Sequence, residues 1–195
     1  HGVTGSGKTM IYMELIADCI RSGKQALYLL PEIALTSQII RRLQQHFGGH
    51  VAVYHSRFND QERIELWQKI RDGEVSIILG ARSAIFLPFN NLGLLIVDEE
   101  HDSSFKQQDP APRYHARDAA IYYASLFGAN VLLGSGTPSL ESYHNAQTGK
   151  YSLVNLSERF GGLELPTIRI VNLGQMMQKG KIMISPPCLL YTSDA

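Results

Sequence analysis

The first nine residues carry the pattern with the clearest chemistry in the chain. They read His-Gly-Val-Thr-Gly-Ser-Gly-Lys-Thr, match the phosphate-binding pattern G-x-x-x-x-G-K-S/T, and lead into an amphipathic stretch. Glycines permit left-handed backbone conformations, so successive N–H groups can converge on phosphate oxygens, and the positive end of the following helix adds to the attraction. The alternative is a surface glycine turn followed by an exposed lysine. The residues expected to bind a nucleotide are Gly2, Thr4, Gly5, Ser6, Gly7, Lys8 and Thr9.

An acidic cluster supplies the second half of a hydrolytic site. The apolar run at residues 94–97 is followed by Asp98, Glu99, Glu100 and His101. Hydrolysis of a Mg²⁺-nucleotide needs one carboxylate that holds the metal and a neighbour that orients the attacking water. We therefore expect Asp98, with Thr9, to bind Mg²⁺, and Glu99 to orient water. Alone, such a cluster is more often a solvated loop, but a phosphate loop in the same sheet favours the hydrolytic interpretation.

A third segment combines aromatic and basic residues. Residues 105–108 and 113–117 read Phe-Lys-Gln-Gln and Arg-Tyr-His-Ala-Arg. Bases stack on aromatic faces at roughly 1–3 kcal/mol each while cations bind phosphates, so this loop could sense single-stranded DNA. The candidate contacts are Phe105, Lys106, Arg113, Tyr114 and Arg117. In the alternative interpretation, Phe105 and Tyr114 are packing residues and Arg117 forms a surface pair with Asp118.

The elements that must position these residues alternate along the chain. Apolar runs of strand length lie at residues 26–30, 51–54, 75–79, 94–97 and 131–133, and helical spacing of apolar residues lies between them. Asn59 with Glu62 resembles a capping box, and Thr36 or Ser37 could cap the helix before it. This order predicts an α/β fold with a doubly wound parallel sheet and helices on both faces. Such sheets gather their chemistry in the loops at the carboxyl ends of the strands, so we expect one site there.

Composition limits the partners. The 195 residues include 18 Lys plus Arg and 18 Asp plus Glu, so the formal charge is zero, and any nucleic acid must be held by local patches or backbone amides. No apolar run approaches the ~18–20 residues of a membrane span, so no membrane role is expected. Two cysteines, Cys19 and Cys188, are too few for a zinc site or a disulfide framework, which favours a reducing cytoplasm.

Six segments together resemble one helicase family. They are GVTGSGKT, PEIALT, GARSAIF, DEEHDSSFKQQ, RYHARD and GSGTPSLES. The chain is similar, from residue 2 to about residue 181, to the PriA-type primosomal replication-restart helicases, the primosomal protein N′ family of superfamily 2. The resemblance implies the first RecA-like P-loop NTPase lobe of a cytoplasmic bacterial motor that uses ATP and Mg²⁺. It also implies 3′ to 5′ movement on single-stranded and forked DNA at stalled forks, with primosome and single-strand-binding proteins as partners.

The resemblance also implies roles for individual residues. It marks Lys8 and Thr9 as contacts of the nucleotide and Mg²⁺. It marks Asp98 and Glu99 as the hydrolytic pair. His101 completes the acidic box, which is residues 98–101, and links the phosphate site to the loop after residue 133. Without the box, the expected interpretation of His101 is a capping or solvated histidine. Thr36, Arg82 and Ser83 lie in loops that touch the DNA backbone. Thr36 as a helix cap and Arg82 as a surface charge remain open alternatives.

We expect three segments: a lobe at residues 1–150 without its first strand, an extension at 151–184, and a tail at 185–195 that departs from the family. The second lobe, whose arginines stabilise the transferring phosphoryl group, and the zinc insertion expected in the full-length family do not fit here. The fragment is thus expected to bind nucleotide weakly and to be inactive as a motor. Competing interpretations are the motor lobe of a restriction or remodelling translocase and a non-catalytic nucleotide-binding module.

Overall fold

The computed structural model describes residues 1–55 and 58–159, which all lie in the compact unit His1–Gly162. The α-helices are α1 (Lys8–Arg21), α2 (Ser37–Phe47), α3 (Asp60–Arg71), α4 (Ala116–Phe127) and α5 (Leu140–Gln147). The strands are β1 (Gln25–Leu29), β2 (Val51–Tyr54), β3 (Ile77–Gly80), β4 (Leu92–Asp98) and β5 (Asn130–Gly134). Short 3₁₀ turns are η1 (Glu32–Ala34), η2 (Gly48–His50), η3 (Arg82–Phe86) and η4 (Ser103–Phe105).

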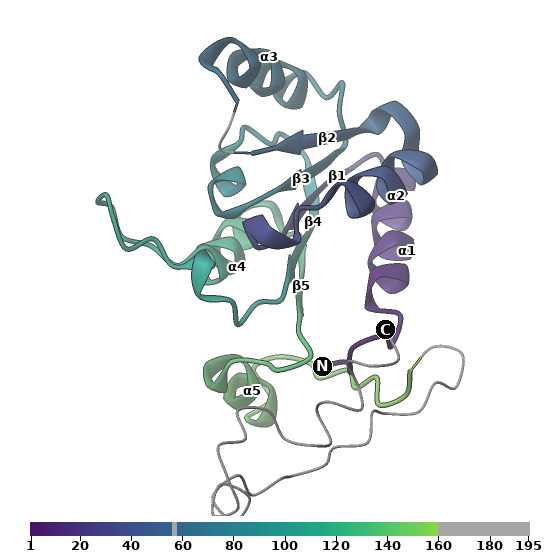
Figure 1. Ribbon diagram of the computed structural model, residues 1–195, viewed down its shortest axis with the longest axis vertical. Coiled ribbons are helices and arrows are strands. Elements are labelled where there is room, and N and C mark those ends of the chain that lie inside the picture. Colours follow the sequence, from purple (N-terminus) through teal and green to yellow (C-terminus); the bar gives the residue numbers. More distant parts are fainter. Residues whose placement is uncertain (56–57, 160–195) are drawn as a thin grey trace, which may run out of the picture. The chain divides into compact units, whose positions relative to one another are not determined.

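The five strands form one parallel sheet in the order β2-β3-β1-β4-β5. Because β1 lies at the centre and later strands add on either side, the sheet is doubly wound, as the alternating pattern predicted. In Figure 1, α1 and α2 lie on one face of the sheet and α3 and α4 on the other. The predicted fold class is therefore confirmed.

The two faces of the central strand explain why residues 26–30 are all apolar. Ala26, Tyr28 and Leu30 pack in the cluster that includes α1 and α2, whereas Leu27 and Leu29 pack in the cluster that includes α3 and α4. Successive side chains of a strand point to opposite faces, so a strand covered on both sides is apolar along most of its length. The buried Gln25 at its start is satisfied by hydrogen bonds from its side chain to Ile70 O and Val75 O.

Local signals behave as expected with two exceptions. The capping box at α3 is complete, with Asn59 Oδ1 accepting from Glu62 N at 2.9 Å and Glu62 Oε2 accepting from Asn59 N at 2.9 Å. Thr36 occupies the N-cap position of α2 without a capping bond from its side chain. The strand predicted at 75–79 begins at Ile77, because the Val75 N–H bonds back to Lys69 O at the end of α3.

The remaining predictions on organisation concern the end of the chain. The described part reaches residue 159, so most of the predicted extension and all of the predicted tail lie outside it. None of the described helices is long and apolar enough to cross a membrane.

Candidate active site

The phosphate-binding loop is held from both sides. The N–H of Gly2 donates to Ser135 O at 3.0 Å, just after β5, and the N–H of Val3 donates to Leu156 O at 3.1 Å. Gly7 caps α1 in the left-handed conformation, with φ 86°. Only glycine adopts that conformation without steric cost, so the loop can turn directly into the helix.

Two polar side chains of this loop face its backbone. Lys8 Nζ donates to Gly2 O at 2.7 Å and to Val3 O at 3.5 Å, so the ammonium lies over the turn. The hydroxyl of Ser6 is buried and has no hydrogen-bond partner among the described residues. A buried polar atom of this kind calls for a ligand, and a phosphate oxygen is a suitable acceptor.

Asp98, the last residue of β4, is oriented by two tyrosines. Tyr12 Oη donates to its Oδ1 at 3.1 Å, and Tyr28 Oη donates to its Oδ2 at 3.0 Å. Burial, with the nearby charge of Asp98, raises the pKa of both tyrosines far above the usual range, so both hydroxyls stay protonated donors. Tyr12 lies on α1 and Tyr28 on β1, which brings the helix after the phosphate loop onto the acidic box.

Gly134 makes room for this contact. A Cβ at Gly134 would fall on the Tyr12 hydroxyl and 3.3 Å from Asp98 Oδ1. The glycine that ends β5 is therefore required by close packing rather than by an unusual backbone angle.

Glu99 adopts a backbone conformation that is rare for its residue type. Its φ is 51°, in the left-handed region, and its N–H donates to Asp98 Oδ1 at 3.1 Å while its carbonyl accepts from Asp102 N at 2.8 Å. Non-glycine residues in this region concentrate at functional sites, where neighbouring bonds maintain the strain. The turn leaves the Glu99 carboxylate partly exposed beside Asp98.

His101 joins the acidic box to the loop after β5. Its Nδ1 lies 2.8 Å from Ser135 Oγ, its Nε2 lies 3.3 Å from Thr137 Oγ1, and Glu99 Oε2 is 3.7 Å from Nδ1. The resemblance implied a link between His101 and the loop after β5, and the contacts with Ser135 and Thr137 form such a link. Because Ser135 O also accepts from Gly2, the phosphate loop, the acidic box and the loop after β5 are connected to one another.

Glu100 is a residue that the sequence analysis left without a role. It is 1% exposed, and its carboxylate accepts from Ser139 N at 2.7 Å and Ser142 Oγ at 2.8 Å, and pairs with Arg117 at 3.0 Å. An acidic residue in a run of polar residues gives no sequence signal of burial, because its partners lie 17 to 42 positions away.

Two of the residues predicted to contact DNA are buried. Phe105 is 0% exposed and belongs to the core under α4, so it has no face for a base. Arg117 is 7% exposed and binds Glu100 and Ser139, so its guanidinium does not face a phosphate. Both assignments are corrected: Phe105 is a packing residue, and Arg117 is an internal ion-pair residue rather than only a surface partner of Asp118.

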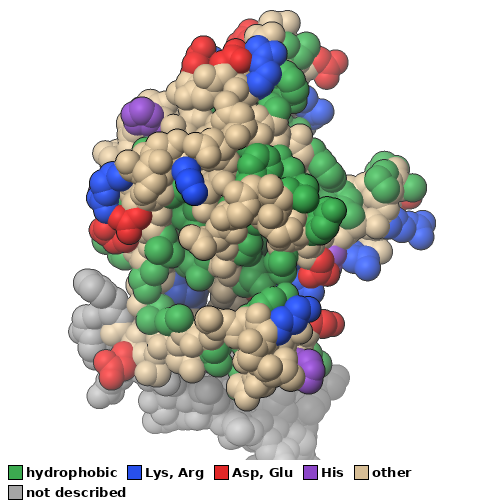
Figure 2. Space-filling view, turned by 180° about the vertical axis from the view of Figure 1, so that it is seen from behind, with side chains coloured by type: hydrophobic (Ala, Val, Ile, Leu, Met, Phe, Trp, Pro, Cys, Tyr) green, Lys and Arg blue, Asp and Glu red, His purple; other side chains and the backbone are tan. Residues whose placement is uncertain are grey.

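The other DNA candidates lie on or near the surface. Four are exposed, namely Thr36, Ser83, Lys106 and Arg113, and two are partly buried, namely Arg82 and Tyr114. Arg82 Nη1 donates to Ser104 O at 3.4 Å and Lys106 O at 3.1 Å, which ties η3 to the loop after η4. This loop projects from the body of the lobe (Figure 1, teal) and carries Lys and Arg side chains (Figure 2, right).

Phe86 is a surface aromatic that the sequence analysis missed. It is 65% exposed, and its ring lies 5.0 Å from that of Tyr114 in an edge-to-face arrangement. The sequence signal that could have identified Phe86 was its place in the GARSAIF segment, which follows a strand at the carboxyl edge of the sheet. Phe86, Tyr114 and the neighbouring cations together have the features of a base-stacking surface.

The donor set fits Mg²⁺ bound with a nucleotide. No group of three or more His, Cys, Asp or Glu residues that could hold a metal occurs within residues 1–55 and 58–159. Mg²⁺ in nucleotide sites takes only one or two protein oxygens and fills its octahedron with phosphates and water. A hydroxyl such as that of Thr9 and a carboxylate such as that of Asp98 are oxygen donors of this kind.

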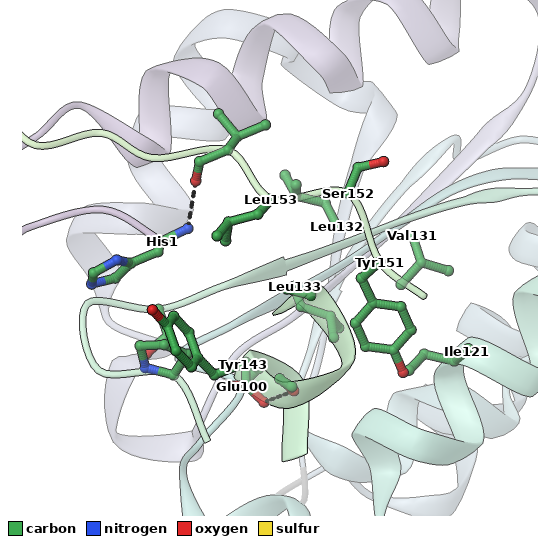
Figure 3. A pocket seen from close by; sticks show the side chains of 15 residues that line it. His1, Glu100, Ile121, Val131, Leu132, Leu133, Tyr143, Tyr151, Ser152 and Leu153 are labelled. Carbon is green, nitrogen blue, oxygen red and sulfur yellow. Dashed lines mark hydrogen bonds between the residues drawn. The ribbon is translucent and has the colours of Figure 1, made fainter. Parts of the chain in front are cut away.

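A separate apolar cavity of about 370 Å³ lies beside β5. It is lined by Val131, Leu133, Tyr143, Tyr151 and Leu153, with Glu100 at its margin (Figure 3). Its lining lacks the phosphate-binding residues, so it is distinct from the nucleotide site.

Comparison with known proteins agrees with this geometry. Residues 1–146 match the family model described as DEAD/DEAH box helicase. The chain belongs to the DEAD/DEAH box helicase family. This helicase lobe is 47% identical over 180 residues to the replication restart protein PriA of Bacillus subtilis, and 48% identical over 189 residues to that of Haemophilus influenzae.

These matches cover 92% and 96% of the helicase lobe but only 22% and 25% of the two relatives. The lobe thus corresponds to about a quarter of their length. Among solved structures it resembles RecG bound to a three-way DNA junction, with a TM-score of 0.59, 24% identity, and coverage of 84% of this chain and 21% of that one. This likeness shows the RecA-like fold.

Proposed function

We propose that this chain is the ATP-binding first lobe of a 3′ to 5′ DNA helicase that unwinds DNA at stalled forks and restarts replication. One observation carries the proposal: the phosphate loop, the acidic box and the loop after β5 form one hydrogen-bonded site at the carboxyl edge of the sheet. The identity of 47–48% to PriA proteins supports the assignment to replication restart.

Each site residue has a role in this mechanism. Lys8 and the N–H groups of the loop bind the phosphates. Thr9 and Asp98 would hold Mg²⁺, which would neutralise the charge that develops on the phosphates. Glu99 accepts a hydrogen bond from the attacking water and orients it. His101 connects Glu99 to Ser135 and Thr137, so that a movement of the loop after β5 reaches the water-binding carboxylate.

DNA is bound by residues on the same edge of the sheet. Thr36, Arg82, Ser83, Lys106 and Arg113 contact phosphates, and Tyr114, with Phe86, stacks on bases. For the full-length protein we propose a second lobe, a zinc insertion, a cytoplasmic location, and primosome and single-strand-binding proteins as partners. Residues 1–195 by themselves are expected to show weak nucleotide binding and little turnover.

Two other functions are distinguishable from this one. A restriction or remodelling translocase would share the lobe, but zinc-ligand cysteine pairs soon after the second-lobe boundary of the full-length protein would favour replication restart. A non-catalytic binding module would bind ATP without DNA-stimulated turnover.

The test is DNA-stimulated ATP hydrolysis by the full-length protein. Lys8→Ala and Glu99→Gln should each lower the stimulated rate by about 10²–10⁴-fold, because one removes phosphate binding and the other removes the group that orients water. The exposed residues Lys24 and Glu14 offer matched controls, and Lys24→Ala and Glu14→Gln should keep the rate. A rate that Lys8→Ala and Glu99→Gln leave unchanged would refute the hydrolytic assignment.

A further inference from the structure

Glu100 and Arg117 form an ion pair in the interior of the lobe. Glu100 is 1% and Arg117 7% exposed, and Arg117 Nη1 lies 3.0 Å from Glu100 Oε2. Arg117 is the second residue of α4, so it follows directly after the projecting loop that carries Arg113 and Tyr114. Glu100 stands between Glu99 and His101.

The same carboxylate also holds the segment after β5. Its Oε1 accepts from Ser139 N at 2.7 Å, and its Oε2 accepts from Ser139 Oγ at 3.1 Å and Ser142 Oγ at 2.8 Å. Arg117 Nη1 in turn donates to Ser139 Oγ at 2.6 Å. Ser139 caps α5 and ends the loop whose Ser135 and Thr137 contact His101.

Stability alone does not account for this arrangement. Two charges removed from water incur a desolvation cost that their attraction only partly repays, and well-packed apolar residues often serve equally well. Such a pair does specify geometry, because the carboxylate and guanidinium hold several partners at fixed distances. Here those partners come from the start of α4 next to the projecting loop, from the acidic box and from the loop after β5.

We propose that Glu100 and Arg117 are positioning residues that transmit DNA binding at the projecting loop to the hydrolytic residues Glu99 and His101. A shift in the first turn of α4 moves Arg117 and, through it, Glu100 and Ser139. The acidic box that carries His101 and the loop that His101 contacts then move together. This inference rests on the proposed helicase function.

The experiment compares DNA-stimulated with basal ATP hydrolysis in the full-length protein. Glu100→Gln and Arg117→Met should each lower the ratio of the two rates about tenfold, in the range of typical coupling between sites, while binding of a fluorescent ATP analogue changes less than twofold. The double variant Glu100→Leu/Arg117→Met replaces the pair by apolar side chains. It should keep the melting temperature near that of the wild type and still show the low ratio.

Asp118 provides the matched control. It bonds to Nε of the same arginine at 2.8 Å, but its side chain is 60% exposed. Asp118→Asn should leave the ratio unchanged, because the contact with Glu100 remains. Melting temperatures of all variants identify a loss that comes only from misfolding.

The outcomes separate this inference from the proposed function. An unstimulated wild type would overturn both. If DNA stimulates the wild type and the folded double variant keeps the full ratio of stimulated to basal hydrolysis, only the positioning role would be overturned. The same holds if the ratio falls only in proportion to the loss of folded protein. A low ratio in the folded double variant, with Asp118→Asn unaffected, supports it.

Discussion

Glu100 remains charged inside the protein because its hydrogen bonds outweigh its loss of hydration. Burial by itself raises the pKa of the carboxyl, but the Ser139 N–H, the Ser142 and Ser139 hydroxyls and Arg117 together bring the pKa below its ordinary value of 4.5. Such a depressed pKa is a statement about stability, since the folded state binds the proton less well than the unfolded state does.

The contribution of Glu100 is fully present above the unfolded pKa of about 4.5 and is lost as pH falls through the lower folded value. Denaturant unfolding measured between about pH 5 and about pH 3 should therefore show a steeper loss of unfolding free energy in the wild type than in Glu100→Gln. Equal slopes would mean that the carboxylate is not stabilised by its partners.

Gly134 gives a second prediction at the scale of one residue. Gly134→Ala places a methyl group on the Tyr12 hydroxyl and should cost about 1–3 kcal/mol of unfolding free energy, the usual range for overpacking. Tyr12→Phe removes the hydroxyl, so the double variant should recover part of this loss. Chemical denaturation of the three variants measures the coupling, and additive effects would contradict the clash.

The helices and strands differ in how far their own residues define them. The capping box fixes the start of α3, and the five apolar runs identify the five strands. At β3 the boundary moved to Ile77 because the Val75 N–H bonds to the end of α3, a contact that apolar spacing does not encode. Likewise Thr36 stands at the N-cap of α2 but makes no capping bond from its side chain.

The backbone near His1 predicts how a preceding strand would dock. Val3 and His1 already pair with Leu156, Gly2 pairs with Ser135, and the Gly2–Leu156 bridge is parallel. Residues placed before His1 would continue between β5 and residues 152–154, where the apolar cavity of Figure 3 lies. A strand placed there would fill this cavity.

Extending the chain with the strand that precedes the lobe in the full-length protein should raise its melting temperature and tighten binding of a fluorescent ATP analogue with Mg²⁺. The physical reason is burial of apolar surface on β5 and firmer support for the phosphate loop. An extension of the same length with its apolar residues replaced by Ser is the control. Identical behaviour of the two extensions would contradict strand docking.

At the scale of the whole chain, residues 1–195 have zero net charge, so the proposed DNA binding would depend on a few local cations. Each phosphate contact to a single strand contributes roughly 0.7 to the slope of log affinity against log salt concentration. Lys106→Gln and Arg113→Gln in the full-length protein should each reduce that slope by about 0.7, whereas Lys69→Gln on α3 should not change it. Fluorescence anisotropy over a salt series makes the measurement, and equal slopes would remove these two cations from the DNA interface.

Some residues of the predicted site could be identified from local sequence patterns, and others could not. Lys8, Asp98 and His101 could be selected because each lies in a short contiguous pattern with a known chemical requirement. Phe105 and Arg117 lie in an equally short pattern, but an aromatic or basic residue in a loop segment can face either solvent or core. Their burial depends on where α4 packs, and Phe86 and Glu100 were missed for the same reason.

The sequence by itself determined the class of fold, the phosphate loop and the acidic box, because continuous apolar runs of strand length, helical spacing and a phosphate-binding turn are properties of neighbouring residues. Only the tertiary structure decided that two tyrosines orient Asp98, that Gly134 must lack a side chain, and that Glu100 and Arg117 form a buried link. The hydrogen bonds among these contacts join residues from 17 to 86 positions apart, and Gly134 meets Tyr12 from still farther along the chain. Their partners are chosen by the packing of helices on the sheet, and local sequence patterns do not contain that information.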